Sequence, residues 1–281
     1  MDNVPYDDWC DLYSDILAEH GVTDGIMLDL GCGTGTMTRR FSRRGFDMIG
    51  VDASEEMLEM AREAELLDEA RTFDTSSNSD VANEAVSDNA SNQAKDILYL
   101  QQDMRSFELY GTVAAVVSVC DSLNYILTEE DLLQVFRLVN NYLDPGGLFV
   151  FDMTTPYQYE NVLGENSFCE SRDEAAFLWE NFFDEENRIN EYDLTLFVRE
   201  GNDRIVEGQN KGNQNASALN EEERYRRFVE THYQRAWTLD EVKALLNESG
   251  LELLAVFGED GKNPLEDMDG RMYFVARECM K

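Results

Sequence analysis

Short apolar runs alternate with amphipathic segments along the first half of the chain. Buried-type strands are predicted at 26–30, 47–51, 97–100, 113–119 and 148–151. Helices with one apolar face are predicted at 7–19, at 36–44, after Ser54 and at 128–143. Because such strands alternate with helices, we expect a doubly wound α/β fold built on a mostly parallel sheet.

The pattern changes after about residue 156. Alternating apolar and polar positions are typical of antiparallel strands with one exposed face, and they occur at 176–183, 188–199 and 224–237. A capping box, Thr238 to Glu241, then begins another helix, and two last strands are predicted at 251–257 and 271–276. We therefore expect a seven-stranded core from residues 1–155 and 238–281, carrying an inserted antiparallel β lid at 156–237.

Two segments are rich in polar residues and nearly lack large apolar ones. Residues 68–95 contain mainly Ser, Asn, Asp and Ala, and residues 201–223 contain mainly Gly, Asn, Gln and Glu. Such compositions bury too little apolar surface to offset the conformational entropy that ordering costs. We expect a disordered insertion in the core and a flexible loop in the lid.

The net charge and the cysteines indicate which kinds of binding partner and which cellular compartment suit this protein. The formal net charge is −35, so the average surface repels polyanions and direct nucleic-acid binding is disfavoured. Five scattered cysteines form no C-x-x-C pair, which predicts no metal site and suits a reducing compartment. The N-terminal residues lack a signal-peptide pattern, and no apolar run is long enough to span a bilayer. We expect a cytoplasmic protein without a membrane partner, and the oligomeric state stays open.

A glycine-rich loop follows the first predicted strand. Gly31, Gly33 and Gly35 lie between that strand and a helix, where backbone N–H groups can face a carboxylate, ribose or phosphate. Asp52, at the end of the next strand, suits the hydroxyl groups of a ribose. The dinucleotide fingerprint needs a glycine where Thr36 stands, so a nicotinamide-dependent oxidoreductase fits less well. These residues indicate a nucleoside cofactor but not a reaction.

Three motifs in register resemble those of class I S-adenosylmethionine-dependent methyltransferases. They are LDLGCGTG at 28–35, GVDAS at 50–54 and QDM at 102–104. The resemblance narrows to the YqeM-type small-molecule methyltransferases of Gram-positive bacteria through DSLNYI at 121–126, LDPGG at 143–147, FDM at 151–153 and ETHYQR at 230–235. It implies the Rossmann-like methyltransferase fold, with S-adenosyl-L-methionine as the cofactor.

The resemblance also implies a set of cofactor-binding residues. The glycine loop would lie against the methionine half of the cofactor, with Asp29 ordering that loop and Asp52 holding the ribose. Asp103 would accept from the adenine amino group, Met104 would meet the ring through its N–H, and Met57 would pack on the adenine face. The other cofactor-binding candidates are Tyr6, Trp9, Gly31, Cys32, Gly33, Gly35, Ala53 and Cys120.

Methyl transfer from a sulfonium is an in-line displacement that positioning and water exclusion can accelerate without a dedicated nucleophile. A base is needed only for a protonated acceptor, and the candidate catalytic residues are Asp121, Tyr125, His232 and Tyr233. Alternatively, Asp121 and Tyr125 order their own loop, and His232 is an ordinary strand residue. We expect methyl transfer to a nitrogen, oxygen or carbon of a small-molecule acceptor. The alternatives are a nicotinamide-dependent oxidoreductase and a non-catalytic S-adenosylmethionine-binding protein.

Overall fold

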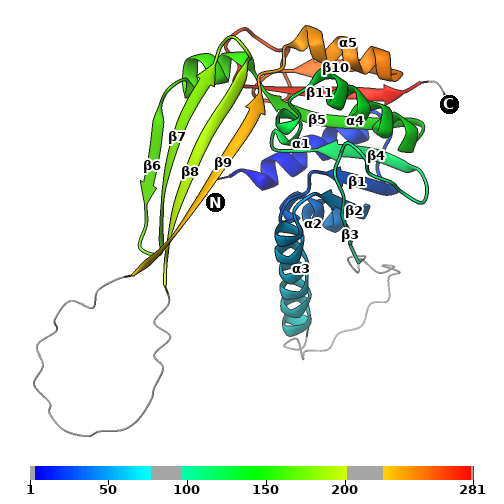
Figure 1. The fold of residues 1–281 in the computed structure, drawn as a ribbon. Helices are drawn as coiled ribbons and strands as arrows, with labels where there is room; N and C mark the ends of the chain where they lie inside the picture. Colours follow the sequence, from blue (N-terminus) through cyan, green and yellow to red (C-terminus); the bar gives the residue numbers. More distant parts are fainter. Residues whose placement is uncertain (1–3, 77–95, 201–223, 280) are drawn as a thin grey trace, which may run out of the picture. The chain divides into compact units, whose positions relative to one another are not determined.

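The computed structural model describes residues 4–76, 96–200, 224–279 and 281 (Figure 1). The chain forms two compact units, one of Met1–Gln158 with Arg235–Lys281 and one of Tyr159–Gln234. Because the first unit combines the N-terminal and C-terminal parts of the chain, the second unit is an insertion within it.

A seven-stranded sheet forms the centre of the first unit, in the order β10-β11-β5-β4-β1-β2-β3. In that order the strands span Leu251–Phe257, Arg271–Glu278, Leu143–Thr154, Val113–Ser118, Ile26–Leu30, Asp47–Asp52 and Leu98–Gln101. Strands β1 to β5 pair in parallel, whereas β11 runs antiparallel to β5 and β10. The expected doubly wound, mostly parallel sheet is confirmed. Its strand order reverses between β1 and β4.

Helices cover both faces of this sheet (Figure 1). They are α1 (Tyr6–Glu19), α2 (Thr36–Arg43), α3 (Glu55–Ser76), α4 (Glu129–Tyr142) and α5 (Leu239–Ser249). Met27 of β1 packs in the core with α1 and α2, whereas its neighbour Leu28 packs in the core with α4 and α5. Side chains alternate across a strand, so a sheet covered on both faces needs continuous apolar runs.

The second unit is built on a four-stranded sheet. Its strands, in order across the sheet, are β6 (Ser167–Ser171), β7 (Ala175–Asp184), β8 (Ile189–Arg199) and β9 (Tyr225–Arg235). Antiparallel pairing joins β6 to β7 and β7 to β8, which confirms the antiparallel insertion. Two elements were not predicted, the short β6, which has Phe168 as its single large apolar residue, and a π-helical turn at Gln158–Leu163.

The chain re-enters the first unit earlier than the expected boundary at residue 237. Trp237, which the sequence analysis assigned to the lid, is fully buried in the core that α4 and α5 cover. Its Nε1 donates a hydrogen bond to the Ile126 carbonyl at 3.0 Å, and the guanidinium of Arg235 lies 3.9 Å from a ring centroid. Burial of so large an aromatic side chain ties this segment to the core.

Part of the segment 68–95 is helical, so the expectation of disorder is wrong for residues 68–76. Helix α3 continues to Ser76, because residues 66–71 favour helix and because Asp68 pairs with Arg39 and Arg43 of α2. The expectations for 77–95 and 201–223 lie outside the described residues. Within the described ranges, no helix is long and apolar enough to cross a membrane.

Candidate active site

The glycine loop joins β1 to α2 in a conformation that its glycines permit. Gly31, Gly33 and Gly35 have φ angles of 81°, 52° and 67°, a left-handed region that residues with a Cβ disfavour. A Cβ at Gly31 would lie 2.8 Å from the Cβ of Ser122, and a Cβ at Gly35 would lie 2.4 Å from the Tyr99 hydroxyl. A Cβ at Gly33 would have no atom within 4 Å. The loop is therefore packed at both ends and open in the middle, where a ligand can approach.

Asp52 ends β2 beside the open glycine. Its Oδ2 accepts a hydrogen bond from the Gly33 N–H at 2.8 Å, and its Oδ1 accepts one from the Ser54 N–H at 2.9 Å. The residue is half-buried, and each carboxylate oxygen can accept a second hydrogen bond. Asp52 thus fixes both the glycine loop and the residue before α3, and it keeps acceptor capacity for hydroxyl groups.

Asp29 lies inside the protein, 2% exposed, and accepts a hydrogen bond from the Thr38 hydroxyl at 2.6 Å. Burial raises the pKa of this carboxyl to about 7, with a further increase from the charge of Asp52. The resemblance implied that Asp29 orders the glycine loop. In the structure Asp29 ties β1 to α2, and the carboxylate that binds an N–H of the loop belongs to Asp52.

The adenine-binding candidates follow β2 and β3. Asp103 accepts from the Arg105 N–H at 2.8 Å and from Arg105 Nε at 2.9 Å, and the hydrogen bonds from the Arg105 side chain lower its pKa. The Met104 side chain reaches the glycine loop, since its Cε lies 3.3 Å from an ideal Cβ at Gly31. Met57 is 43% exposed, so its side chain is accessible to a ligand.

The loop after β4 faces the glycine loop across the switch in strand order. Ser122, at the start of a 3-10 turn, donates to the Gly31 carbonyl at 3.3 Å. The two residues before it, Cys120 and Asp121, have φ angles of 63° and 52°. Asn124 of the same turn is fully buried and bonds to the Thr154 backbone, with its amide 3.2 Å from the Thr154 carbonyl. Ligands of open α/β sheets bind at such a switch point.

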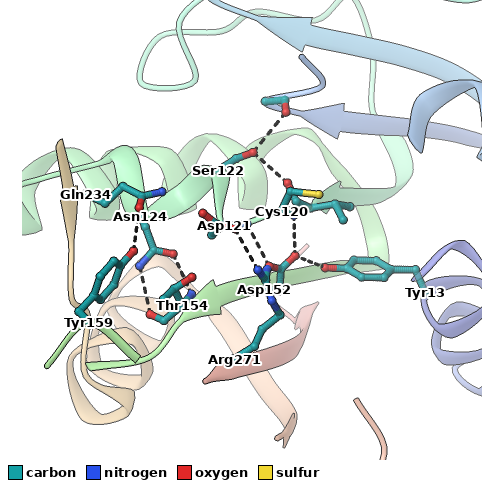
Figure 2. Close-up of polar contacts among 12 residues, drawn as sticks. Tyr13, Cys120, Asp121, Ser122, Asn124, Asp152, Thr154, Tyr159, Gln234 and Arg271 are labelled. Carbon is teal, nitrogen blue, oxygen red and sulfur yellow. Dashed lines mark hydrogen bonds and ion pairs between the residues drawn. The ribbon is translucent and has the colours of Figure 1, made fainter. Parts of the chain in front are cut away.

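A buried carboxylate that the sequence analysis did not select holds this loop (Figure 2). Asp152 of β5 is 1% exposed, and its Oδ1 accepts from the Cys120 N–H at 2.9 Å and from the Tyr13 hydroxyl at 2.7 Å. Its Oδ2 accepts from the Asp121 N–H at 3.0 Å and from the guanidinium of Arg271. The sequence signal for Asp152 is an acid inside a continuous apolar strand, but its partners come from distant segments.

The two cysteines among the cofactor candidates are not nucleophiles. Burial, followed by the charges of nearby acids, raises the pKa of the Cys32 and Cys120 thiols above the ordinary value, so both stay protonated. The backbone of each joins its own loop to a strand: the Cys32 N–H donates to the Val51 carbonyl of β2 at 3.0 Å, and the Cys120 N–H donates to Asp152 of β5 at 2.9 Å. Ala53, another cofactor candidate, is exposed, and its carbonyl accepts from Gln101 at 3.3 Å. Among the described residues, no cluster of His, Cys, Asp and Glu side chains could hold a metal ion.

Two aromatic cofactor candidates lie on α1. The rings of Tyr6 and Trp9 meet edge to face with centroids 5.9 Å apart. Each also faces an arginine, Arg40 at 5.3 Å from the Tyr6 centroid and Arg271 at 5.4 Å from the Trp9 centroid. Trp9 therefore lies next to the guanidinium that contacts Asp152.

The four catalytic candidates fall into two pairs. In the first unit, Asp121 forms an ion pair with Arg271 at 3.1 Å, and Tyr125 is 42% exposed. In the second unit, His232 and Tyr233 are neighbours on β9, so their side chains point to opposite faces of the sheet. A single acceptor on one face of that sheet can therefore contact His232 or Tyr233, but not both.

The fold, the glycine loop between β1 and α2, and the acid that ends β2 are those of S-adenosylmethionine-dependent methyltransferases. The chain belongs to the methyltransferase domain family, which matches residues 3–256. It is similar to the YqeM protein of Bacillus subtilis (strain 168), with 28% identity over 279 residues, 99% of this chain and 92% of the relative.

Two further proteins extend the comparison. A solved S-adenosylmethionine-dependent methyltransferase from Clostridium acetobutylicum ATCC 824 has a TM-score of 0.75 and 25% identity, covering 99% of this chain and 94% of that one. The dTDP-3-amino-3,4,6-trideoxy-alpha-D-glucopyranose N,N-dimethyltransferase of Streptomyces venezuelae is 29% identical over 126 residues, 45% of this chain and 41% of the relative. The resemblance seen in the sequence is confirmed. The chain is an S-adenosylmethionine-dependent methyltransferase, and the oxidoreductase alternative is set aside.

Proposed function

We propose that S-adenosylmethionine binds across the carboxyl ends of β1, β2 and β3 and that its methyl group passes to a nitrogen, oxygen or carbon of a small molecule. The observation that carries this proposal is the half-buried Asp52, which binds the N–H of the one loop glycine that faces open space. A small acceptor is supported by the relative from Streptomyces venezuelae, whose name gives a nucleotide-linked amino sugar as its substrate. The net charge of −35 further disfavours a nucleic-acid substrate.

The residues present fit this cofactor. Asp52 would hold the ribose hydroxyls, Asp103 and Met104 the adenine edge, and the exposed Met57 the adenine face. When bound, S-adenosylmethionine supplies a methyl group on a sulfonium that is ready to leave. The chain's own tasks are then to bind the cofactor, to orient the acceptor in line with the methyl group and to exclude water.

We assign acceptor recognition to the insertion at 156–237, because the three cofactor motifs all lie outside it. One face of its sheet carries a row of rings on successive strands, Phe168, Trp179, Tyr192 and His232, with centroid separations of 5.4, 5.0 and 4.7 Å. Trp179 Nε1 is buried and has no hydrogen-bond partner among the described residues. A flat organic acceptor suits such a row of rings.

Asp121 and Tyr125 are the candidates for orienting or deprotonating the acceptor from the first unit. The Asp121 carboxylate is positioned by the guanidinium of Arg271, which donates to its Oδ1 at 3.1 Å. A carboxylate can bind a cationic amine and take its proton, whereas the exposed hydroxyl of Tyr125 can donate to or accept from a neutral acceptor.

Calorimetry with Asp52→Ala tests the cofactor assignment. Loss of hydrogen bonds to a charged acceptor should weaken S-adenosylmethionine binding by about 1.5–3 kcal/mol, which is about 10- to 150-fold. Asp47→Ala, at the opposite end of β2, is the matched control and should leave the affinity unchanged. NAD should show no saturable binding. Equal affinity in Asp52→Ala and the parental protein would contradict the assignment.

The acceptor is tested separately, by measuring release of S-adenosylhomocysteine with a metabolite library and, in parallel, with RNA, DNA and protein. We expect release with a small organic nucleophile. Release only with RNA, DNA or protein would overturn the small-molecule part of the proposal.

A further inference from the structure

Two consecutive residues other than glycine adopt the left-handed conformation at the carboxyl end of β4. Cys120 has φ 63° and Asp121 has φ 52°. A Cβ makes this region unfavourable, so a pair of such residues persists only where their surroundings hold them. The pair also directs two successive backbone N–H groups to the same side, which forms a concave site for an anion.

The anion in this concave site is the protein's own Asp152. Both N–H groups donate to it, Cys120 to Oδ1 at 2.9 Å and Asp121 to Oδ2 at 3.0 Å. Two side chains complete its surroundings, the Tyr13 hydroxyl at 2.7 Å and the guanidinium of Arg271 (Figure 2). Burial, and then the charge of Asp152, raise the pKa of Tyr13, so its hydroxyl remains a donor. A carboxylate that is 1% exposed thus has a cation and three further donors.

The turn formed by Cys120 and Asp121 lies on the side of the site where we expect the methionine half of the cofactor. Ser122, directly after it, donates to the Gly31 carbonyl of the glycine loop at 3.3 Å. Under the proposed function, the nucleoside lies along the ends of β2 and β3. Since β1 lies between β2 and β4 in the sheet, the rest of the cofactor extends toward β1 and β4.

We propose that Asp152 is a positioning residue which, with Arg271 and Tyr13, fixes the Cys120–Asp121 turn as the wall that receives the methionine half of the cofactor. The inference rests on the proposed cofactor orientation. Asp152 itself, being buried, acts through the turn and has no contact with the ligand.

Two ligands separate this role from a general effect on the fold. S-adenosylmethionine has the amino-acid half, whereas 5′-methylthioadenosine lacks it and keeps the nucleoside. In Asp152→Asn, one oxygen acceptor is replaced by an NH₂ donor that faces N–H groups, so the turn should lose its fixed geometry. We expect calorimetry to show binding of S-adenosylmethionine weakened about tenfold or more and binding of 5′-methylthioadenosine changed by less than about twofold.

Glu278→Gln is the matched control. Glu278 is also a buried carboxylate, 2% exposed, and accepts a backbone N–H, that of Gly146 at 3.0 Å, at the other end of β11 from Arg271. It should lower stability but leave both affinities unchanged. Equal weakening of the two ligands in Asp152→Asn, or unchanged binding of both, would overturn the inference. A parental protein that bound neither ligand would instead contradict the proposed function.

A second variant tests the backbone argument directly. Cys120→Gly removes the Cβ that makes φ 63° unfavourable. The substitution is made both in the parental protein and in Asp152→Asn, and the affinity for S-adenosylmethionine is measured in each. In Asp152→Asn it should recover at least about threefold of the lost affinity for S-adenosylmethionine, and in the parental protein it should bring no gain. The same change in both backgrounds would mean that Asp152 does not hold the turn.

If Asp152→Asn does not fold, hydrogen exchange of the parental protein tests whether Asp152 holds the Cys120–Asp121 turn. The amides of Cys120 and Asp121 should exchange at least about a hundredfold more slowly than in an unstructured chain, because both donate to a buried carboxylate. Fast exchange, as in an exposed loop, would overturn the inference.

Discussion

Replacing Asp29 by Asn should change how the stability of this protein depends on pH. Asp29 is 2% exposed and contacts the Thr38 hydroxyl at 2.6 Å. Burial raises its pKa from 3.8 to about 7. The folded protein therefore binds this proton more tightly than the unfolded chain does. The resulting contribution to stability is fully present below about pH 4 and is lost as the pH rises through about 7.

The size of the effect follows from the pKa difference of about 3 units, because one unit corresponds to about 1.4 kcal/mol, which gives about 4 kcal/mol in total. Asn keeps the shape of the side chain and an oxygen for Thr38, but it has no proton to lose. Between pH 4.5 and pH 8, the free energy of unfolding of Asp29→Asn should rise relative to that of the parental protein by about 3 kcal/mol.

Urea unfolding at fixed salt, followed by circular dichroism across this pH range, measures the difference between the two proteins. Asp24→Asn is the control for the loss of one negative charge from a very acidic chain, since Asp24 is exposed and precedes β1. The free energy of unfolding of Asp24→Asn should change with pH in the same way as that of the parental protein. A difference between Asp29→Asn and the parental protein that did not change with pH would refute the reasoning, because no buried ionisation would then be linked to folding.

Two further predictions concern the loop and the insertion. Gly35→Ala should lower the free energy of unfolding more than Gly33→Ala does, because a Cβ at Gly35 would lie 2.4 Å from the Tyr99 hydroxyl, whereas a Cβ at Gly33 would have no atom within 4 Å. Urea titration of both variants measures the two losses, and equal losses would contradict the prediction. His232→Phe and Tyr233→Phe should leave S-adenosylmethionine affinity within about twofold, while the one that faces the acceptor lowers kcat or raises KM, as steady-state kinetics with the identified acceptor will measure. Parental kinetics in both variants would leave Asp121 and Tyr125 as the remaining candidates.

The elements that the sequence predicted are those with a local signal. The buried strands of the sheet are covered on both faces and therefore read as continuous apolar runs, and the glycine loop and the capping box at Thr238 depend on neighbouring residues alone. The short β6 has Phe168 as its one large apolar residue, so no period is visible there. The helical end of α3 was missed because residues 68–76 share the polar composition of the residues that follow them.

The part of the candidate site that the sequence did not predict depends on contacts between distant segments. Asp29 lies within a recognisable strand, Asp52 ends the next one and Asp103 follows the third, so their positions could be read from spacing. Asp152 has the same kind of position at the end of β5, but Tyr13 lies 139 residues from it in the chain and Arg271 lies 119 residues from it. No local pattern links them, and only the strand order places β11 beside β5 and β5 beside β4.

Three aspartates near the carboxyl ends of strands show how surroundings set the role of one residue type. Asp29 is buried with one hydroxyl donor, so its charged form is unfavourable and its pKa rises to about 7. Asp152 is equally buried, but two N–H groups, a hydroxyl and a guanidinium surround it, so it can fix a strained turn. Asp52 has two N–H donors and is half-buried. A carboxylate that binds ribose must be held in place and must still have lone pairs free for the hydroxyl groups. Of the three aspartates, only Asp52 combines a fixed carboxylate with access for a ligand.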